Sequence, residues 1–166
     1  MHLVALALAV WTLLHFTGCQ TTPDAPPNHE TVEIDGHTFH LELAADEDSR
    51  LRGLGGRTEL AEDAGMLFVF PDAAVREFVM RDCLIDIDII FLDAAGRITR
   101  MHAMTVEPPR RPDESLWDYE SRLRRYSSGS RAQFAIELRG GWLEQLDLDV
   151  QDRIELDVER LKRRAQ

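Results

Sequence analysis

The sequence predicts an α+β fold that is mainly β, with a compact antiparallel or barrel-like sheet and a few short helices. Several short segments either alternate apolar and polar residues or are wholly apolar, which is the pattern of strands. Glycine, aspartate and proline separate these segments at short intervals, as turns require. Segments with helical spacing are few and short. Strands are therefore expected to outnumber helices.

The first predicted element is a β-hairpin. Apolar and polar residues alternate over 32–34 and again over 39–43, so each segment has one apolar face. Between them lie Asp35 and Gly36, a pair that accepts the positive φ angles of a tight two-residue turn. The two segments are expected to pair as adjacent antiparallel strands.

Two short helices are predicted to follow the hairpin. Residues 46–54 start with Asp46, whose side chain can cap a helix, and continue with acidic residues that favour the first turn. Glycines within 53–56 end this helix. Thr58 is expected to cap the second helix, which continues to Glu62.

Runs of apolar residues predict the central strands. Residues 66–70 are wholly apolar and are closed by Pro71, and 85–92 is the most apolar stretch of the domain. The other strands are predicted at 78–80, 97–106, 133–138 and 152–158. Later helices are predicted at 115–126 and 142–148.

The N-terminal segment predicts export from the cytoplasm. Residues 3–14 are almost continuously apolar, but they are too short to span a bilayer core of ~30 Å as a helix. A short apolar stretch that ends in small residues is typical of a secretory signal, here residues 1–18. Thr17-Gly18-Cys19 resembles a bacterial lipoprotein processing site, where cleavage precedes an acylated cysteine. An ordinary secretory signal with a chance cysteine is the alternative.

Acylation of Cys19 implies lasting attachment to membrane lipid, because mature bacterial lipoproteins carry several acyl chains. Gln20 differs from the aspartate that retains many such proteins in the inner membrane. The expected location is therefore the periplasmic face of the outer membrane. Residues 19–30 form the lipidated N-terminus and a proline-rich stretch, which is predicted to be an extended tether.

The rest of the chain is predicted to be one globular domain, residues 31–158, followed by a charged tail at 159–166 that frays. The chain holds 19 basic and 30 acidic residues, for a net charge of −11. This balance argues against nucleic acid as a partner, because phosphate binding needs a basic surface.

Asp88 is the chemically unusual residue of the domain, because a carboxylate within the apolar stretch 85–92 is costly unless it is paired. One interpretation is the floor of a polar pocket, where Asp88 accepts hydrogen bonds from Arg57 and Arg81. Met80 would then supply an apolar wall. The other interpretation is a structural ion pair that ties the glycine-rich segment to the sheet. The candidate ligand-binding residues are therefore Arg57, Met80, Arg81 and Asp88.

Other kinds of chemistry find less support. The sequence has no phosphate loop, nucleophile motif or metal-ligand spacing of high specificity, so no metal or cofactor is expected. Asp86 and Asp88 could hold a divalent cation only with further oxygens, or could act on a glycan as a pair of carboxylates. Cys83 is expected to be a buried, inert thiol.

Several motifs, in order along the chain, resemble the domain-of-unknown-function 192 family. They lie within residues 32–158 and include Arg50-Leu-Arg-Gly-Leu54, Gly65 to Pro71, Phe78 to Asp93, Gly96-Arg-Ile98, and Glu137-Leu138 with Gly140-Gly141-Trp142. The chain departs from the family pattern where Trp, Lys, Asn, Thr and Pro are replaced by Val79, Arg81, Asp82, Cys83 and Asp86. The resemblance implies a compact, mainly β fold that is often exported or lipid-anchored. It implies no activity, but it adds weight to Asp88 and Arg57 as a linked pair.

Taken together, these features predict a membrane-anchored periplasmic lipoprotein whose domain binds a small polar ligand or an envelope protein, and they lean away from an enzyme. One alternative is an envelope glycan hydrolase that uses Asp88 as its acid/base. Another is an assembly or accessory protein that works through its acidic surface.

Overall fold

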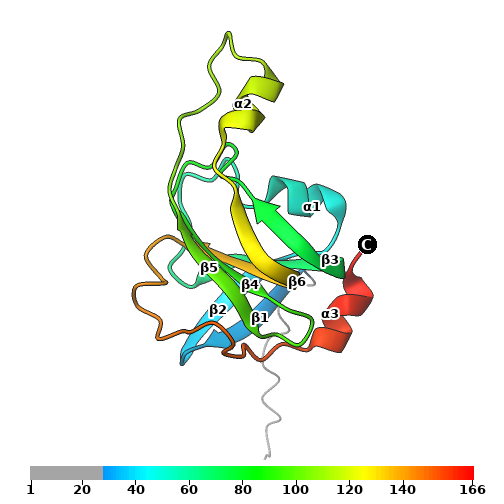
Figure 1. Cartoon of the computed structure of the whole chain (residues 1–166). Helices are drawn as coiled ribbons and strands as arrows, with labels where there is room; N and C mark the ends of the chain where they lie inside the picture. Colours follow the sequence, from blue (N-terminus) through cyan, green and yellow to red (C-terminus); the bar gives the residue numbers. More distant parts are fainter. Residues whose placement is uncertain (1–27) are drawn as a thin grey trace, which may run out of the picture.

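A six-stranded mixed sheet is the framework of the domain in the computed structural model, which describes residues 28–166 (Figure 1). The strands are β1 (His29–Ile34), β2 (His37–Ala44), β3 (Ala64–Phe78), β4 (Ile87–Leu92), β5 (Ile98–Met104) and β6 (Tyr126–Arg139). The helices are α1 (Glu47–Arg52), α2 (Leu116–Arg122) and α3 (Val158–Arg164). The fold is α+β and mainly β, as the sequence predicts. The predicted signal, Cys19 and most of the tether lie outside the described residues.

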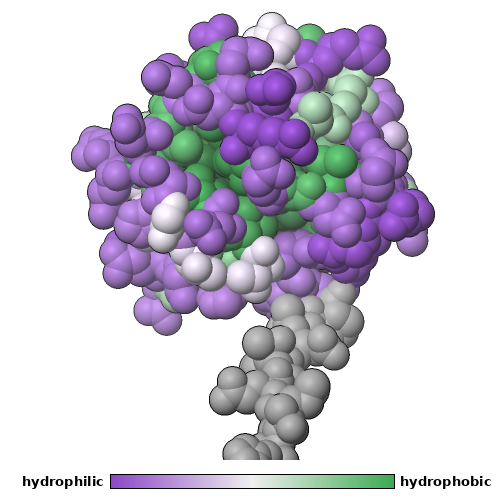
Figure 2. Space-filling model, turned by 90° about the horizontal axis from the view of Figure 1, so that it is seen from below, coloured by the Kyte–Doolittle hydropathy of each residue, from purple (hydrophilic) through white to green (hydrophobic). Residues whose placement is uncertain are grey.

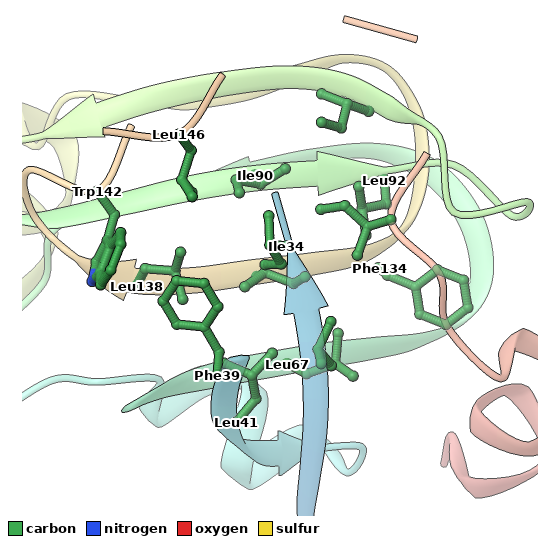
Figure 3. Packing of buried hydrophobic residues seen from close by; sticks show 14 of the residues in the cluster. Ile34, Phe39, Leu41, Leu67, Ile90, Leu92, Phe134, Leu138, Trp142 and Leu146 are labelled. Carbon is green, nitrogen blue, oxygen red and sulfur yellow. The ribbon is translucent and has the colours of Figure 1, made fainter. Parts of the chain in front are cut away.

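The strands follow the order β1-β2-β3-β6-β4-β5, and all neighbours are antiparallel except β2 and β3. The parallel pair arises because residues 45–63, which include α1, carry the chain back along the sheet before β3 begins. The sheet is therefore mixed and open, not purely antiparallel or closed. It resembles a barrel only in that the β1–β2 hairpin lies across one face of β4 and β6 (Figure 3).

The predicted hairpin is confirmed. Asp35 (φ 48°) and Gly36 (φ 75°) connect β1 to β2 with the left-handed backbone that a tight turn needs. Ile34 and Phe39 lie on the inner face of the hairpin and pack in the same buried cluster as Ile90 of β4 (Figure 3). The alternation in the sequence thus sets which face of the hairpin is buried.

Strand β3 runs for 15 residues where the sequence predicts two short strands. It continues past Pro71 because its register with β6 shifts between Val69 and Ala74, so this proline does not have to donate to the ladder. Near the start of β3 the two backbones approach closely. A Cβ on Gly65 would overlap the carbonyl oxygen of Glu137, so only glycine fits there.

Buried apolar residues fill both faces of the sheet. In β6, Phe134, Ile136 and Leu138 join the cluster beneath the β1–β2 hairpin, whereas Ala135 joins a second cluster on the opposite face. Glu137 alternates with these residues and therefore points to the second face. This second face carries the candidate site described below.

Three predicted elements are wrong. Residues 58–62 and 142–148 are irregular, with turns and bends instead of helices. Of residues 152–158, Arg153 makes an isolated bridge with Arg97 and Val158 begins α3, so no strand forms. The irregular conformation of residues 142–148 has a clear cause. Trp142 is only 6% exposed, and its Nε1–H donates to the Glu62 carbonyl at 2.7 Å, which fixes the segment without a helix.

The segment predicted as a fraying charged tail instead forms α3 and docks on the domain. Leu161 is only 1% exposed, and Arg160 donates two hydrogen bonds to the Glu30 carboxylate of β1, at 2.8 and 2.5 Å. Asp157 caps the helix by accepting from the Arg160 backbone N–H. A single buried leucine among charged residues gives too weak a sequence pattern to predict this docking.

The surface of the domain is largely hydrophilic, in keeping with its charge, although apolar side chains lie in a hollow on the face shown in Figure 2. Within residues 28–166, no helix is both long and apolar enough to cross a bilayer.

Candidate functional site

An open pocket of about 500 Å³ lies between α1 and the distal half of β3. Its apolar wall comes chiefly from Phe68, Phe70 and Phe78 of β3, together with Leu54 and Val79. Arg50, Arg52, Arg76 and Arg81 also line it. A small-molecule site usually combines an apolar wall with a few placed polar groups, and this pocket has such a wall beside a larger number of charged side chains.

The phenylalanines hold one another in edge-to-face contacts. The centroid of the Phe78 ring lies 5.0 Å from that of Phe68, 6.3 Å from that of Phe70 and 5.4 Å from that of Phe91. Ring pairs at these distances and angles add attraction beyond simple area burial. The bulge within β3 is what brings Phe78 back over the face that already carries Phe68.

Glu137 of β6 lies against this wall and is the most unusual titratable group of the pocket. It is 6% exposed, and its Oε2 has no hydrogen-bond partner within residues 28–166. Burial raises the pKa of Glu137 to about 8, although the Leu54 backbone N–H and the charge of Arg57 both act to lower that pKa. The carboxyl group is therefore mostly protonated at neutral pH.

Backbone geometry places Glu137 at this point. It lies opposite Met66 of β3 and Ile89 of β4, in the middle of the sheet. Gly53 covers it from the α1 side, since a Cβ on this glycine would lie 3.5 Å from Glu137 Oε2. Gly53 has φ 52°, a left-handed conformation in which it ends α1.

Guanidinium groups stand around the apolar wall. Arg76 lies over the Phe70 ring at 4.2 Å and pairs with Asp72 at 2.7 Å. Arg50 lies over the same ring at 5.6 Å and donates to the Val69 carbonyl at 3.0 Å. These contacts hold the arginines beside the pocket without neutralising all of their charge.

Of the residues predicted from the sequence, only Arg81 lines this pocket, where its Nε pairs with Glu120 of α2 at 2.6 Å. Met80 is 1% exposed and belongs to the core cluster beneath the pocket. Arg57 donates to both oxygens of Glu42 at 2.5 and 2.7 Å, which lowers the pKa of Glu42. The structure thus gives Arg57 a structural partner on β2.

Asp88 lies on the other face of the sheet, apart from the pocket. It is 2% exposed, and its Oδ2 accepts the Leu143 backbone N–H at 2.7 Å. Burial raises the pKa of Asp88, whereas the amides of Leu143, Gly141 and Trp142 lower it. Asp88 therefore fixes the turn after β6, and the expected pairing with Arg57 does not form.

Sequence reasoning did not single out Glu137, although the signal was present. Glu137 lies in the run Phe-Ala-Ile-Glu-Leu, so it is a lone carboxyl group in an apolar strand, as Asp88 is. A buried carboxyl group is costly without a partner, so Glu137, like Asp88, is a residue whose sequence context indicates an unusual environment. The sequence does not indicate which of the two carboxyl groups, Asp88 or Glu137, meets enough hydrogen-bond donors.

Metal and thiol chemistry find no geometric support in this site. No three histidine, cysteine, aspartate or glutamate side chains of the described segment come together as a metal cluster. Cys83 lines the pocket as the buried thiol that the sequence predicts, and burial raises its pKa to about 12. A thiol in this state is a poor nucleophile at neutral pH.

The family model for DUF192, described as an uncharacterized ACR, matches residues 30–156. The chain belongs to the DUF192 family. This match agrees with the resemblance carried by the sequence motifs and spans almost the whole described domain. No curated protein matches the chain.

Two crystal structures resemble this DUF192 domain. A protein of unknown function from Novosphingobium aromaticivorans is 25% identical, with a TM-score of 0.64, over 82% of this chain and 94% of that one. A protein from Sinorhizobium meliloti, provisionally described as a transcription regulator, is 25% identical, with a TM-score of 0.61, over 75% of this chain and 89% of that one. Both support the fold and neither names a reaction.

Replacing Asp88 by alanine should lower the free energy of unfolding by about 1–3 kcal/mol, because the buried Leu143 amide would lose its acceptor. Urea denaturation measures this change. The matched control is Asp86→Ala, which removes an acceptor from the exposed Val106 amide and should cost less, since water can replace it. Equal losses in the two variants would contradict the structural role of Asp88.

Replacing Glu137 by glutamine should stabilise the domain increasingly as the pH rises. The unfolded carboxyl ionises near 4.5 and the folded one near 8, so between these values the native state binds more protons and wild-type stability falls with pH. The glutamine variant lacks this loss. Urea denaturation at pH 5, 6.5 and 8 should therefore show the variant gaining up to a few kcal/mol over wild type, at ~1.4 kcal/mol per pKa unit. Glu33→Gln, on the exposed side of β1, is the control. If the two variants changed the free energy of unfolding equally at every pH, the raised pKa of Glu137 would be wrong.

Proposed function

We propose that this chain is an exported, lipid-anchored DUF192 protein whose domain binds a small molecule in the Glu137 pocket. The observation that carries the proposal is the unpartnered Oε2 of a carboxyl group that is 6% exposed and lines an open cavity. Buried polar atoms are almost always paired, and leaving one unpaired costs about 1–3 kcal/mol. A ligand that bonded to this oxygen would recover that cost on binding.

The dimensions and chemistry of the pocket agree with this role. A cavity of about 500 Å³ falls within the range of small-molecule sites, which is roughly 300–1,000 Å³. Its wall of phenylalanines offers apolar contact area, while Glu137 and the arginines offer a few directional contacts. The pocket is also preformed, because ring–ring contacts and strand pairing hold its wall without a ligand.

Hydrolysis of glycans through Asp88 is disfavoured. Asp88 is 2% exposed, its Oδ2 accepts the Leu143 backbone N–H, and it does not line the pocket described above, so a sugar in that pocket would not meet it. The neighbouring carboxylate, Asp86, accepts from the Val106 amide at 2.7 Å. An acid/base pair for this chemistry needs both groups to flank a substrate cleft.

An accessory role remains a second candidate, because α2 exposes large apolar side chains. Trp117 is 79% exposed and Leu116 is 58% exposed. Figure 1 places α2 at the far end of the domain from the β1–β2 hairpin, on an extended arm. An exposed tryptophan on such an arm suits contact with another protein.

The anchoring part of the proposal rests on the N-terminal sequence. The apolar residues 3–14, the Thr17-Gly18-Cys19 site and the proline-rich tether are its supports. The stretch from Cys19 to the start of β1 at His29 could extend over roughly 30 Å at ~3.3 Å per residue. The domain would then sit close to the membrane surface, on the periplasmic face of the outer membrane.

A fragment screen by thermal shift on the full chain in detergent should yield compounds that stabilise it, by ~2.7 kcal/mol at 100 times Kd. Val79→Trp should abolish the shift, because an indole in place of Val79 would fill the pocket. Val150→Trp, at an exposed position outside the pocket lining, is the matched control and should keep the shift. Compounds that bound Val79→Trp as well as wild type would contradict the pocket.

Replacing Cys19 by serine should move the protein from the membrane fraction to the soluble periplasmic fraction, because the acylated thiol would be lost. Fractionation with immunoblotting and mass spectrometry of the N-terminus measure this. Cys83→Ser, which alters the buried thiol, is the control and should leave the protein on the membrane. A Cys19→Ser protein that stayed membrane-bound would contradict lipid anchoring.

A further inference from the structure

Among the residues that line the pocket, three buried side-chain atoms lack a hydrogen bond within residues 28–166. Arg81 Nε is nevertheless ion-paired with Glu120 at 2.6 Å, which leaves Oε2 of Glu137 and Nε of Arg76. Both residues line the same cavity. The Arg76 Nε–H can only donate, so a ligand that satisfies it must bring an acceptor atom.

The charge around the cavity also selects a kind of ligand. Arg50, Arg52, Arg76 and Arg81 line it, whereas Glu47 and Glu77 are its carboxylates apart from Glu137. Guanidinium groups therefore outnumber carboxylates in the lining, although the pairs Arg76–Asp72 and Arg81–Glu120 compensate part of their charge. The guanidinium groups of Arg50 and Arg76, which lie beside the Phe70 ring, attract an anion that enters this cavity. They repel a cation.

Glu137 has surroundings that suit the uncharged acid. The charged group that faces it from the loop after α1 is Arg57, which is already paired with both oxygens of Glu42. Cys83, from the segment between β3 and β4, faces it as a neutral thiol. On the same sheet face, two strands away, His102 of β5 is bound through Nε2 to the Ser127 carbonyl at 2.8 Å. No cation within the described residues is therefore committed to Glu137, which can donate as well as accept.

We infer that the ligand is a small organic anion with three recognised parts. An acidic group lies at the arginines and accepts from Arg76 Nε. An apolar body, aromatic or branched, lies along Phe68, Phe70 and Phe78. A hydroxyl or carbonyl oxygen at the other end bonds to the carboxyl group of Glu137, whose Oε2 has no partner within residues 28–166. This inference rests on the proposed function and specifies its ligand class.

The alternative ligand for a carboxyl group among aromatic rings is an organic ammonium ion, which would need Glu137 ionised. Two features of the pocket oppose it. The faces of the Phe70 ring are already used by the guanidinium groups of Arg50 and Arg76. An ammonium ion would also leave Arg76 Nε without its acceptor.

The inference can be tested with matched probes by isothermal titration calorimetry on the full chain in detergent. The probes are 4-hydroxyphenylacetate, phenylacetate, which lacks the distal oxygen, and tyramine, which replaces the acid by an amine. We expect 4-hydroxyphenylacetate to bind most tightly and tyramine most weakly. Between pH 6 and pH 9 the affinity of wild type for 4-hydroxyphenylacetate should fall about tenfold, because the carboxyl group of Glu137 ionises in this range.

Variants separate the two contact points. Glu137→Gln mimics the uncharged acid, so its affinity for 4-hydroxyphenylacetate should be independent of pH, while Glu33→Gln should behave as wild type. Arg76→Gln and Arg76→Lys should both weaken the two acids about tenfold, the lysine variant showing that the planar donor matters as well as the charge. Unchanged binding in both Arg76 variants would overturn the inference.

Two further outcomes distinguish the ligand class from the function itself. Tyramine binding that strengthened with pH and disappeared in Glu137→Gln would overturn the anion class, yet would leave the pocket as the binding site. If none of the three probes bound, and no compound of the fragment screen was lost in Val79→Trp, both the ligand class and the proposed function would be wrong.

Discussion

The antiparallel pairing of β3 with β6 is the constraint on which the rest of the domain depends. These are the two longest strands, and they lie in the middle of the sheet, where each also pairs with another strand. The two strands approach closely at Gly65, where a side chain would overlap the backbone of Glu137. The same pairing shifts register between Val69 and Ala74, which bends β3 so that its distal half carries Phe78 back toward Phe68. The core and the pocket wall are thus products of one strand pair.

Two buried carboxyl groups show how similar sequence contexts lead to different roles. Asp88 and Glu137 both interrupt apolar strands, and burial raises the pKa of both. Asp88 meets the backbone amides of a tight turn, so its charge is partly compensated and its role is structural. Glu137 meets one backbone amide and lines an open cavity, and its Oε2 has no hydrogen-bond partner within residues 28–166. The difference lies in what the chain brings opposite each group, and not in the groups themselves.

Much of the fold could be predicted from local patterns. The β1–β2 hairpin, the Asp46 cap of α1 and the buried strand β4 each depend on residues close together in the sequence. Predictions were wrong where distant contacts decide. Trp142 binds the Glu62 carbonyl and holds its segment as a turn, and Arg160 binds Glu30 and docks a helix where a frayed tail was expected. Neither partner lies near enough in the sequence to give a local signal.

The features of the candidate site also fall into two groups, those set by the sequence and those set by distant contacts. The sequence by itself determined the DUF192 membership, the fold class, the hairpin, and the fact that buried carboxyl groups had to find partners, since burying charge is costly in any protein. Only the tertiary structure decided that Arg57 pairs with Glu42, that Asp88 is satisfied by amides, and that Glu137 lies beside an open pocket. The physical reason is that these pairings join side chains from strands and loops far apart in the chain. Which of them meet depends on sheet order and register, and a linear pattern of residues does not contain that order.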